Sequence, residues 1–256
     1  MSKFWNVVAR VVDAADIVLL VLDARMVDET RNRDIERMVK EKGRPLIYVI
    51  TKCDLVEKDL MEQWKRTLSP CVFVSATKYH GLAMLKERIC VEASRAGLDK
   101  EKIEVGVLGY PNVGKSSLIN AMTGRGSAKA SPLAGLTRGK KRIASLRGGI
   151  TFIDTPGVIP FAERHSEESK LKHAIIGAVD YNQEKEPDLV VIALMEQYPG
   201  LLEKEYSVPV FEDKEETLAC IAIKRRLFLK GQKPDLRRAA VMILKDWQAG
   251  KIKPGV

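Results

Sequence analysis

Hydrophobic and polar positions along the first two thirds of the chain predict strands and helices in alternation. Short apolar runs of strand length lie at 17–22, 45–50, 71–74, 104–108 and 150–153, with a further strand expected near 141–147. Segments with helical spacing of apolar residues lie near 4–13, 30–42, 58–68, 80–96 and 115–123. Alternation of this kind builds a mostly parallel sheet flanked by helices, so the pattern predicts an α/β fold.

The alternation stops after Phe161, and the rest of the chain favours helix. Helical segments are expected at 169–181, 188–198, 215–229 and 235–248, with breaks at Pro187, Pro199-Gly200, Pro209 and 231–234. We therefore predict a first domain at 1–164 and a small all-α domain at 165–256. The second domain follows directly on the segment at 154–157, so a shift of that segment could reorient it. A loose linker between the domains is the alternative.

A phosphate-binding loop stands between the predicted strand at 104–108 and the predicted helix at 115–123. Residues 109–116 read Gly-Tyr-Pro-Asn-Val-Gly-Lys-Ser, the GxxxxGKS pattern, in which backbone amides and a helix N-terminus face an anion. We expect Lys115 to contact the β- and γ-phosphates and the Ser116 hydroxyl to ligate Mg²⁺. A glycine-rich turn that binds nothing is the alternative, and the Lys-Ser ending argues against it. The predicted nucleotide-binding residues of this loop are Asn112, Val113, Gly114, Lys115, Ser116 and Ser117.

Two further segments are expected to meet the γ-phosphate. Asp154-Thr155-Pro156-Gly157 follows the strand at 150–153 and has the DxxG pattern. Asp154 would reach Mg²⁺ through water, and the Gly157 amide would face the γ-phosphate. Thr137 lies in the polar loop at 124–140, where its hydroxyl could ligate Mg²⁺ only with the γ-phosphate present, or could simply be solvated. The catalytic set predicted on this basis is Lys115, Thr137 and Gly157.

The candidate for base recognition lies upstream of the phosphate loop. Thr51-Lys52-Cys53-Asp54 ends the strand at 45–50, where open α/β sheets bind ligands. The Asp54 carboxylate can accept hydrogen bonds from the guanine ring NH and 2-amino group, whereas adenine would leave it unpaired. Backbone amides of Ser75, Ala76 and Thr77, after the strand at 71–74, can support the base. Taken alone, residues 51–54 could be an ordinary strand-to-helix turn.

The order of these motifs resembles the circularly permuted GTPases of the YlqF type, also called the ribosome biogenesis GTPase A family, with archaeal and eukaryotic relatives. In ordinary P-loop GTPases the phosphate loop comes first. Asp23-Ala24-Arg25 and Arg31-Asn32 also resemble family signatures, as do 231–240 and 244–251 near the other end. The resemblance implies a permuted GTPase domain, a helical C-terminal domain, and hydrolysis of GTP to GDP as a switch in assembly of the large ribosomal subunit.

Departures from the family pattern limit what the resemblance implies. Thr51 stands where members usually carry an asparagine that binds guanine N7 and steadies the phosphate loop, so we expect a loss of that reach. Val27 replaces a signature proline, and the chain has no histidine before His80. Val158 stands where Ras-like enzymes carry a water-orienting glutamine, so slow, partner-dependent turnover is expected. Asn112 matches an asparagine that lets related GTPases use K⁺, although a turn role explains it equally well.

The composition predicts a basic surface that could bind a partner. The formal net charge is +9, with basic residues clustered at 138–142 and again at 224–238, whereas 203–216 is acidic. Such runs are more often solvated faces than binding sites, but together with the resemblance they favour ribosomal RNA read through its phosphates. A nucleotide-gated RNA-binding module with incidental hydrolysis remains the alternative function; an ATPase or small-molecule kinase is disfavoured by the motifs at 51–54 and 75–77.

The sequence also predicts a cytoplasmic location. The apolar run at 17–22 is too short to span a bilayer, and no lipidation motif is present, so no membrane partner is expected. The scattered cysteines form no CxxC pair and are expected to be reduced. They are Cys53, Cys71, Cys90 and Cys220.

Overall fold

The structure is a computed structural model that describes residues 3–99, 102–124, 141–144, 149–160, 163 and 167–254. The chain divides into two compact units, Met1–Arg164 and His165–Val256. We describe each unit by itself. Thr137, the predicted switch threonine, lies outside the described residues.

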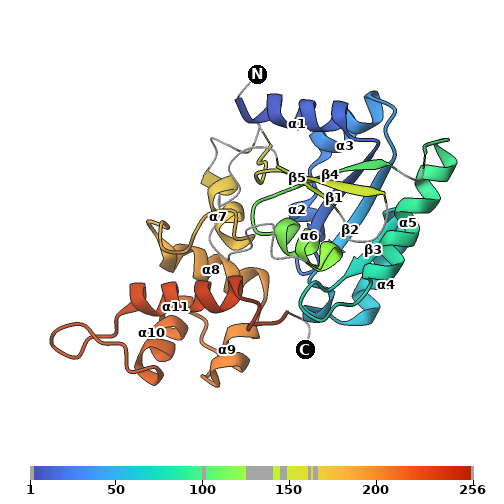
Figure 1. The fold of residues 1–256 in the computed structure, drawn as a ribbon. Helices are drawn as coiled ribbons and strands as arrows, with labels where there is room; N and C mark the ends of the chain where they lie inside the picture. The colour runs from blue at the N-terminus through green and yellow to red at the C-terminus, as the bar shows by residue number, and fades with distance from the viewer. Residues whose placement is uncertain are drawn as a thin grey trace. The chain divides into compact units, whose positions relative to one another are not determined.

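The first unit is built on a six-stranded sheet with the strand order β3-β2-β1-β4-β6-β5 (Figure 1). Five strands run parallel, and β5 pairs antiparallel with β6 at one edge. The predicted α/β fold with a mostly parallel sheet is therefore confirmed. The strands are β1 (Ile17–Asp23), β2 (Leu46–Thr51), β3 (Cys71–Val74), β4 (Ile103–Gly109), β5 (Lys141–Ala144) and β6 (Ile150–Asp154).

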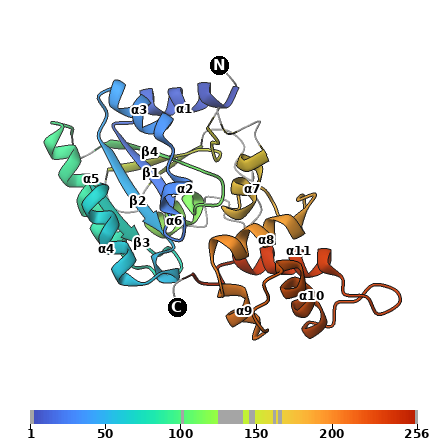
Figure 2. The same ribbon diagram turned by 180° about the vertical axis from the view of Figure 1, so that it is seen from behind.

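Helices cover both faces of this sheet. Right-handed crossovers from β1 to β2 and from β2 to β3 place α3 and α4 on one face, and the return from β3 to β4 places α5 on the other. α1 lies beside α3, as both ribbon views show (Figure 2). The helices are α1 (Lys3–Ala14), α2 (Val27–Thr30), α3 (Arg33–Glu41), α4 (Lys58–Thr67), α5 (Leu82–Arg95) and α6 (Lys115–Thr123), with a 3₁₀ turn, η1, at Cys53–Leu55.

The core explains why the apolar runs fold as strands. Every side chain of β1 is buried, as a central strand covered on both faces requires. On one face, Val18, Leu20 and Leu22 pack with residues of α1 and α3 in a single hydrophobic cluster. The predicted helix at 30–42 is interrupted because the Asn32 side chain accepts a hydrogen bond from the Ile35 amide (3.1 Å) and so begins α3 as its N-cap.

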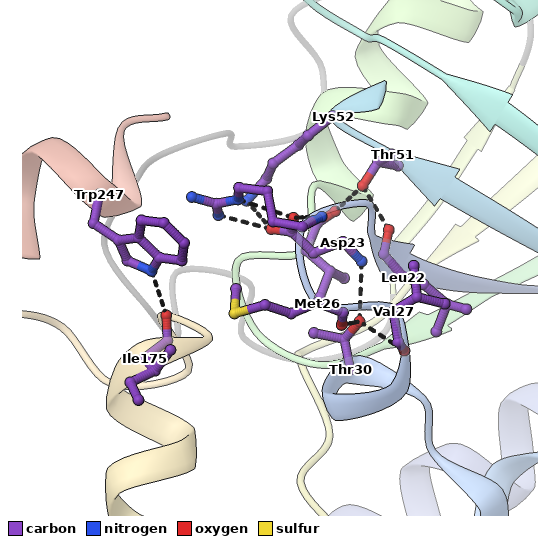
Figure 3. Close-up of polar contacts among 11 residues, drawn as sticks. Leu22, Asp23, Met26, Val27, Thr30, Thr51, Lys52, Ile175 and Trp247 are labelled. Carbon is purple, nitrogen blue, oxygen red and sulfur yellow. Dashed lines mark hydrogen bonds and ion pairs between the residues drawn. The ribbon is translucent and has the colours of Figure 1, made fainter. Parts of the chain in front are cut away.

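The second unit is helical, as predicted for the end of the chain. α11 packs against α8 and α10, and the buried Trp247 indole donates a hydrogen bond to the Ile175 carbonyl (2.7 Å; Figure 3). The helices are α7 (Glu167–Ile175), α8 (Pro187–Gln197), α9 (Leu201–Tyr206), α10 (Lys214–Lys224) and α11 (Leu236–Gln248).

Three helices in this unit differ clearly from the sequence prediction. α7 ends before Gly177, which has a positive φ of 70°, so it is shorter than the predicted 169–181. α9 was not predicted; it begins after Gly200 and ends before Ser207, both in the left-handed region. α10 stops at Lys224, because the chain turns at Arg226 into a hairpin-like loop at 225–235. That loop extends away from α10 and α11 in both ribbon views.

Candidate nucleotide-binding site

The parallel strands bring the predicted motifs together at one edge of the sheet. Their carboxyl ends carry Asp23, Thr51, Val74, Gly109 and Asp154, and the last four of these ends lead into segments that the sequence predicts to bind the nucleotide. In open α/β sheets this edge is where ligands bind. The segments that follow β2, β3, β4 and β6 are 51–54, 75–77, 109–116 and 154–157.

The phosphate loop holds a buried lysine. The Lys115 side chain is 6% exposed, and its ammonium donates to the carbonyls of Gly109 (3.1 Å) and Tyr110 (2.5 Å). Burial lowers the pKa of Lys115 to about 8, and the charge of Asp154 only partly opposes this shift. A cation held this way has poor solvation, so an anion reaching the loop would be strongly favoured.

The backbone of the loop needs residues that accept a positive φ. Gly109 has a φ of 148°, and a Cβ there would lie 2.5 Å from the Val21 carbonyl oxygen, so only glycine fits. Gly114, at φ 100°, precedes α6. Asn112 has a φ of 58°, a conformation that asparagine adopts more readily than most residues. The turn explanation for Asn112 therefore has direct geometric support, whereas its role toward K⁺ stays a prediction.

The segment after β6 packs directly on the phosphate loop. A Cβ on Gly157 would lie 2.3 Å from the Pro111 nitrogen, so the close approach requires glycine. The Val158 amide donates to the Gly109 carbonyl (3.1 Å), and the Thr155 hydroxyl donates to the Val107 carbonyl (2.7 Å). These contacts place the backbone of Gly157 against the loop, where its amide was predicted to act.

Two of the three predicted Mg²⁺ residues, Ser116 and Asp154, lie side by side. The Ser116 hydroxyl is 3.3 Å from the buried Asp154 carboxylate, the two being brought together by α6 and β6. Hard oxygen donors of this type, few in number and next to a phosphate loop, suit Mg²⁺ held largely by substrate phosphates. The described residues contain no cluster of three or more His, Cys, Asp or Glu side chains fit for a metal.

Thr51 joins the segment after β2 to the phosphate loop. Its buried hydroxyl lies 2.9 Å from the Leu22 carbonyl oxygen and also within hydrogen-bond reach of the Val113 carbonyl oxygen (Figure 3). The Cβ position of Gly114 is 3.4 Å from the same hydroxyl. From the sequence we expected Thr51 to be too short to contact the phosphate loop as the usual asparagine does. The structure corrects this expectation, because the Thr51 side chain still contacts the loop. Contact of the Thr51 side chain with guanine N7 stays a prediction.

The residues predicted to hold the base lie in two ordered turns. Asp54 is part of η1 and is partly exposed, and Lys52 before it has a left-handed φ of 57°. The buried Ser75 forms a two-way backbone bridge with His80. Its hydroxyl accepts from the Lys78 amide (3.1 Å) and lies 3.2 Å from the Thr77 hydroxyl. Ala76 and Thr77 therefore stand in a closed turn beyond β3.

A buried ion cluster at the end of β1 was not assigned a role from sequence. The Asp23 carboxylate, fully buried, pairs with Arg25 (2.8 Å) and with Lys52 (2.6 Å; Figure 3). Burial alone would raise the pKa of Asp23, but the two cations outweigh it and hold that pKa below its usual range. The cluster fixes Lys52, two residues before Asp54. The signal was present: an acidic residue ends a fully apolar strand at the ligand edge.

Thr30 orders the turn after β1. The Thr30 hydroxyl accepts from the Asp23 amide (3.0 Å) and donates to the Met26 carbonyl (2.6 Å), which links the end of β1 to α2.

None of the helices in the described part of the chain has the length and apolar character needed to cross a membrane.

Comparison with known proteins gives a family match over residues 104–223, to the family described as 50S ribosome-binding GTPase. The match begins at β4, so the segments at 51–54 and 75–77 lie upstream of it, as a permuted order requires. A GTP-binding protein of Methanocaldococcus jannaschii, MJ1464, is 39% identical over 96% of this chain and 65% of its own length. Nucleolar GTP-binding protein 2 of Yarrowia lipolytica is 33% identical over 98% of this chain and 50% of its own length.

The fold comparison agrees. GNP-bound YlqF from T. maritima superimposes with a TM-score of 0.67 at 19% identity, covering 99% of this chain and 96% of that one. The GDP-bound form gives the same TM-score over 95% and 94%. The chain spans between half and two thirds of the length of the curated relatives quoted above. These similarities confirm the resemblance drawn from the motifs.

Proposed function

We propose that this chain, a relative of the circularly permuted GTPases of the YlqF and nucleolar GTP-binding protein 2 type, binds GTP and GDP and hydrolyses GTP as a switch in large ribosomal subunit assembly. The observation that carries the proposal is the hydroxyl contact of Thr51 with Val113. It ties the guanine-recognition segment to the phosphate loop, so a nucleotide bound by both would meet one connected surface. The Asp54 carboxylate selects guanine, with support from the turn at 75–77.

The described groups at the phosphate end have proposed roles that follow from their positions, and Thr137 has one that follows from the sequence. Lys115 neutralises the β- and γ-phosphates, and the amides of residues 112–116 donate to them. Ser116, Asp154 and Thr137 are the proposed Mg²⁺ residues, Asp154 acting through water. Mg²⁺ would supply charge neutralisation between the β- and γ-phosphates. The Gly157 amide faces the γ-phosphate, and its packing on Pro111 makes it sensitive to what the loop holds.

Intrinsic turnover is proposed to be slow. The Val158 side chain is buried, at 2% exposed, and apolar, so it cannot orient a water molecule as a glutamine does. We propose that Asn112 helps to hold K⁺ as a substitute positive charge. Turnover in K⁺ against Na⁺ tests this: Asn112→Gly keeps the positive φ of the turn and should remove the K⁺ effect, whereas Asn112→Ala removes the side chain and also strains the turn. Equal rates in the two ions for the parent protein would refute the K⁺ role.

The second unit is proposed to contact ribosomal RNA through its hairpin-like loop. The Leu229 amide donates to Lys233 (2.8 Å) and the Asp235 amide donates to Leu227 (3.0 Å), so the loop is an ordered hairpin. Exposed apolar side chains, Phe228 (42%) and Leu229 (55%), stand among its cations. A surface that combines cations with exposed apolar side chains suits a nucleic acid, because the cations can bind its phosphates and the apolar side chains can contact its accessible bases. The basic residues of this region are Lys224, Arg225, Arg226, Lys230, Lys233, Arg237 and Arg238.

Nucleotide state is proposed to reach the second unit through the chain that follows Gly157. The Tyr110 hydroxyl of the phosphate loop donates to the Glu163 carboxylate (2.7 Å), so this chain is held to the loop at both ends. Loss of the γ-phosphate would release Gly157 and loosen that hold. Tyr110→Phe keeps the buried ring and removes the hydrogen bond. It should weaken the effect of nucleotide on ribosome binding while sparing GDP affinity.

The deciding experiment is co-sedimentation with large ribosomal subunits in the presence of a GTP analogue or GDP, together with GTP turnover with and without the subunits. A switch predicts binding that depends on the nucleotide and turnover raised by the subunits, by a factor of up to about 10³ to 10⁵ for an activating partner. RNA binding that depends on nucleotide but leaves turnover unchanged would favour the alternative, a nucleotide-gated RNA-binding module. We also propose a cytoplasmic location, where the chain would encounter ribosomal subunits.

A further inference from the structure

A basic groove lies along α3 in the first unit, outside the nucleotide edge. It has a volume of about 480 Å³ and is lined by cations of α3 and the following turn over the first half of β2. Tyr48 forms part of its lining, and Thr51, which belongs to the nucleotide edge, does not. We call it the α3 groove. The residues that matter to the argument are Arg33, Glu36, Arg37, Lys40, Arg44 and Tyr48.

The helical positions of the α3 cations form one stripe. Arg33, Arg37 and Lys40 are at i, i+4 and i+7, which lie on the same face of a helix. From Arg33 to Lys40 the helix rises roughly 10 Å, more than a single phosphate group can bridge. A ligand that neutralises both ends must therefore carry several negative charges along its length.

Most of the positive charge in the groove is not neutralised by the protein. Glu36 is already engaged by Arg31 in a two-pronged pair (2.6 and 3.0 Å), and Asp34 pairs with Arg37 (2.5 Å). In the part of the chain that the structure describes, Arg33 and Lys40 have no acidic partner within salt-bridge distance.

The remaining cation and the aromatic lining complete the groove. Arg44 donates to the Asp13 backbone carbonyl (3.1 Å), and among the described residues no acidic side chain pairs with it, since the Asp13 carboxylate pairs with Lys42. Burial and the nearby Glu36 carboxylate raise the pKa of the half-buried Tyr48, so the phenol stays neutral, and the Arg31 guanidinium lies over its ring (5.8 Å to the centroid). The groove thus offers an excess of positive charge beside an aromatic side chain.

We propose that the α3 groove binds the phosphodiester backbone of RNA, as a contact separate from the hairpin of the second unit. The charge stripe requires a polyanion, and RNA carries a phosphate charge at every nucleotide. The chain then holds RNA from each of its two units, and the combined affinity exceeds either contact alone when one RNA reaches both.

A charge-matched pair of variants tests the groove. Arg33→Gln with Lys40→Gln removes two charges there, and Arg88→Gln with Arg95→Gln removes two from α5, where both arginines lie by Glu92. Binding of a fluorescent oligouridylate of about 20 nucleotides is measured over a range of salt. The groove variant should lose about tenfold in affinity and lower the salt slope by about 1.4, whereas the α5 variant should change little.

Further readouts keep the test decisive. GDP affinity measured on the same samples should be unchanged in both variants. A failure of the RNA proposal can therefore be told apart from a failure of the nucleotide-site assignment. Lys40 should be protected from an amine-reactive label by the oligouridylate and Lys58 of α4 should not. Equal RNA affinity for the two variants would overturn the proposal. So would protection of Lys40 by vesicles containing phosphatidylserine without protection by RNA.

Discussion

The nucleotide edge and the hairpin of the second unit carry their polar groups in opposite ways. At the edge, Lys115, Thr51 and Asp23 are buried, and each is held by backbone or ionic partners. In the hairpin, Arg226 and Lys230 are exposed, and the order of the loop comes from its backbone. Buried, linked groups respond together to one change, whereas exposed charges act almost independently. We therefore expect large, coupled effects at the edge and small, additive ones in the hairpin.

The largest effect is expected for Lys115→Ala. Losing the charge that faces the phosphates should weaken GTP and GDP binding by about a hundredfold. The fold should survive, since the change removes a buried ammonium rather than creating one. Calorimetric titration measures the affinity, and circular dichroism with thermal melting checks the fold. Lys86→Ala, on the surface of α5, is the control. A folded Lys115→Ala protein that binds GDP like the parent would refute the phosphate-loop assignment.

Asp54→Asn is the next test, and it concerns the base. An amide cannot accept from both guanine donors, so GDP affinity should fall by about thirtyfold. Xanthosine diphosphate, whose 2-oxo group accepts from the new amide, should gain affinity at the same time. Competition between the two nucleotides measures the change, with Asp59→Asn on α4 as the control. An unaltered preference for GDP would remove Asp54 from the site.

Thr51→Val tests whether the edge acts as one connected surface. Valine keeps the shape but loses the hydroxyl that touches Leu22 and Val113, so we expect about a tenfold loss in nucleotide affinity from a residue that need not touch the nucleotide. Thr67→Val, which removes an exposed hydroxyl near the Trp64 carbonyl, should have no effect. If the two variants bind GDP equally well, the two segments are not coupled through Thr51.

Thr51 also shows where sequence reasoning stops. The mostly parallel sheet and the placement of the motifs after its strands follow from short apolar runs that end in polar motifs, and these were predicted. Which atoms a side chain reaches depends on register between β1 and β2, where Asp23 lies opposite Thr51. That register is set by packing of the whole sheet and is not encoded locally. For the same reason the pairing of Asp23 with Lys52 could not be predicted.

In the second unit the limits are of another kind. The helix at 215–229 was predicted too long because its apolar spacing continues through Phe228 and Leu229. The chain instead leaves the helix at Lys224, and these two side chains stay exposed. Periodicity cannot tell a buried apolar residue from one kept at the surface for a partner. That ambiguity concerns the residues that we propose contact RNA.

A smaller effect is expected from pH at the edge. Bound phosphates favour the charged form of Lys115 and raise a pKa that is about 8 in the free protein. Nucleotide binding should therefore take up a proton as pH rises through 8, and affinity should be about fourfold lower at a pH of about 8.5 than at a pH of about 7. Calorimetry in buffers of different ionisation enthalpy measures the uptake. No uptake at the higher pH would show that Lys115 is already charged without nucleotide.

The smallest single effect is expected in the hairpin. Arg226→Gln removes one exposed charge, so RNA affinity should fall by only about twofold to threefold, and the salt slope by about 0.7. Adding Lys230→Gln should multiply the loss by a similar factor, because the two charges do not share partners in the described residues. Binding of labelled large-subunit RNA to the single and double variants measures both steps. A double variant that loses far more than the product of the singles would show that the hairpin, like the nucleotide edge, works as a coupled surface, and the contrast between the two regions would fail.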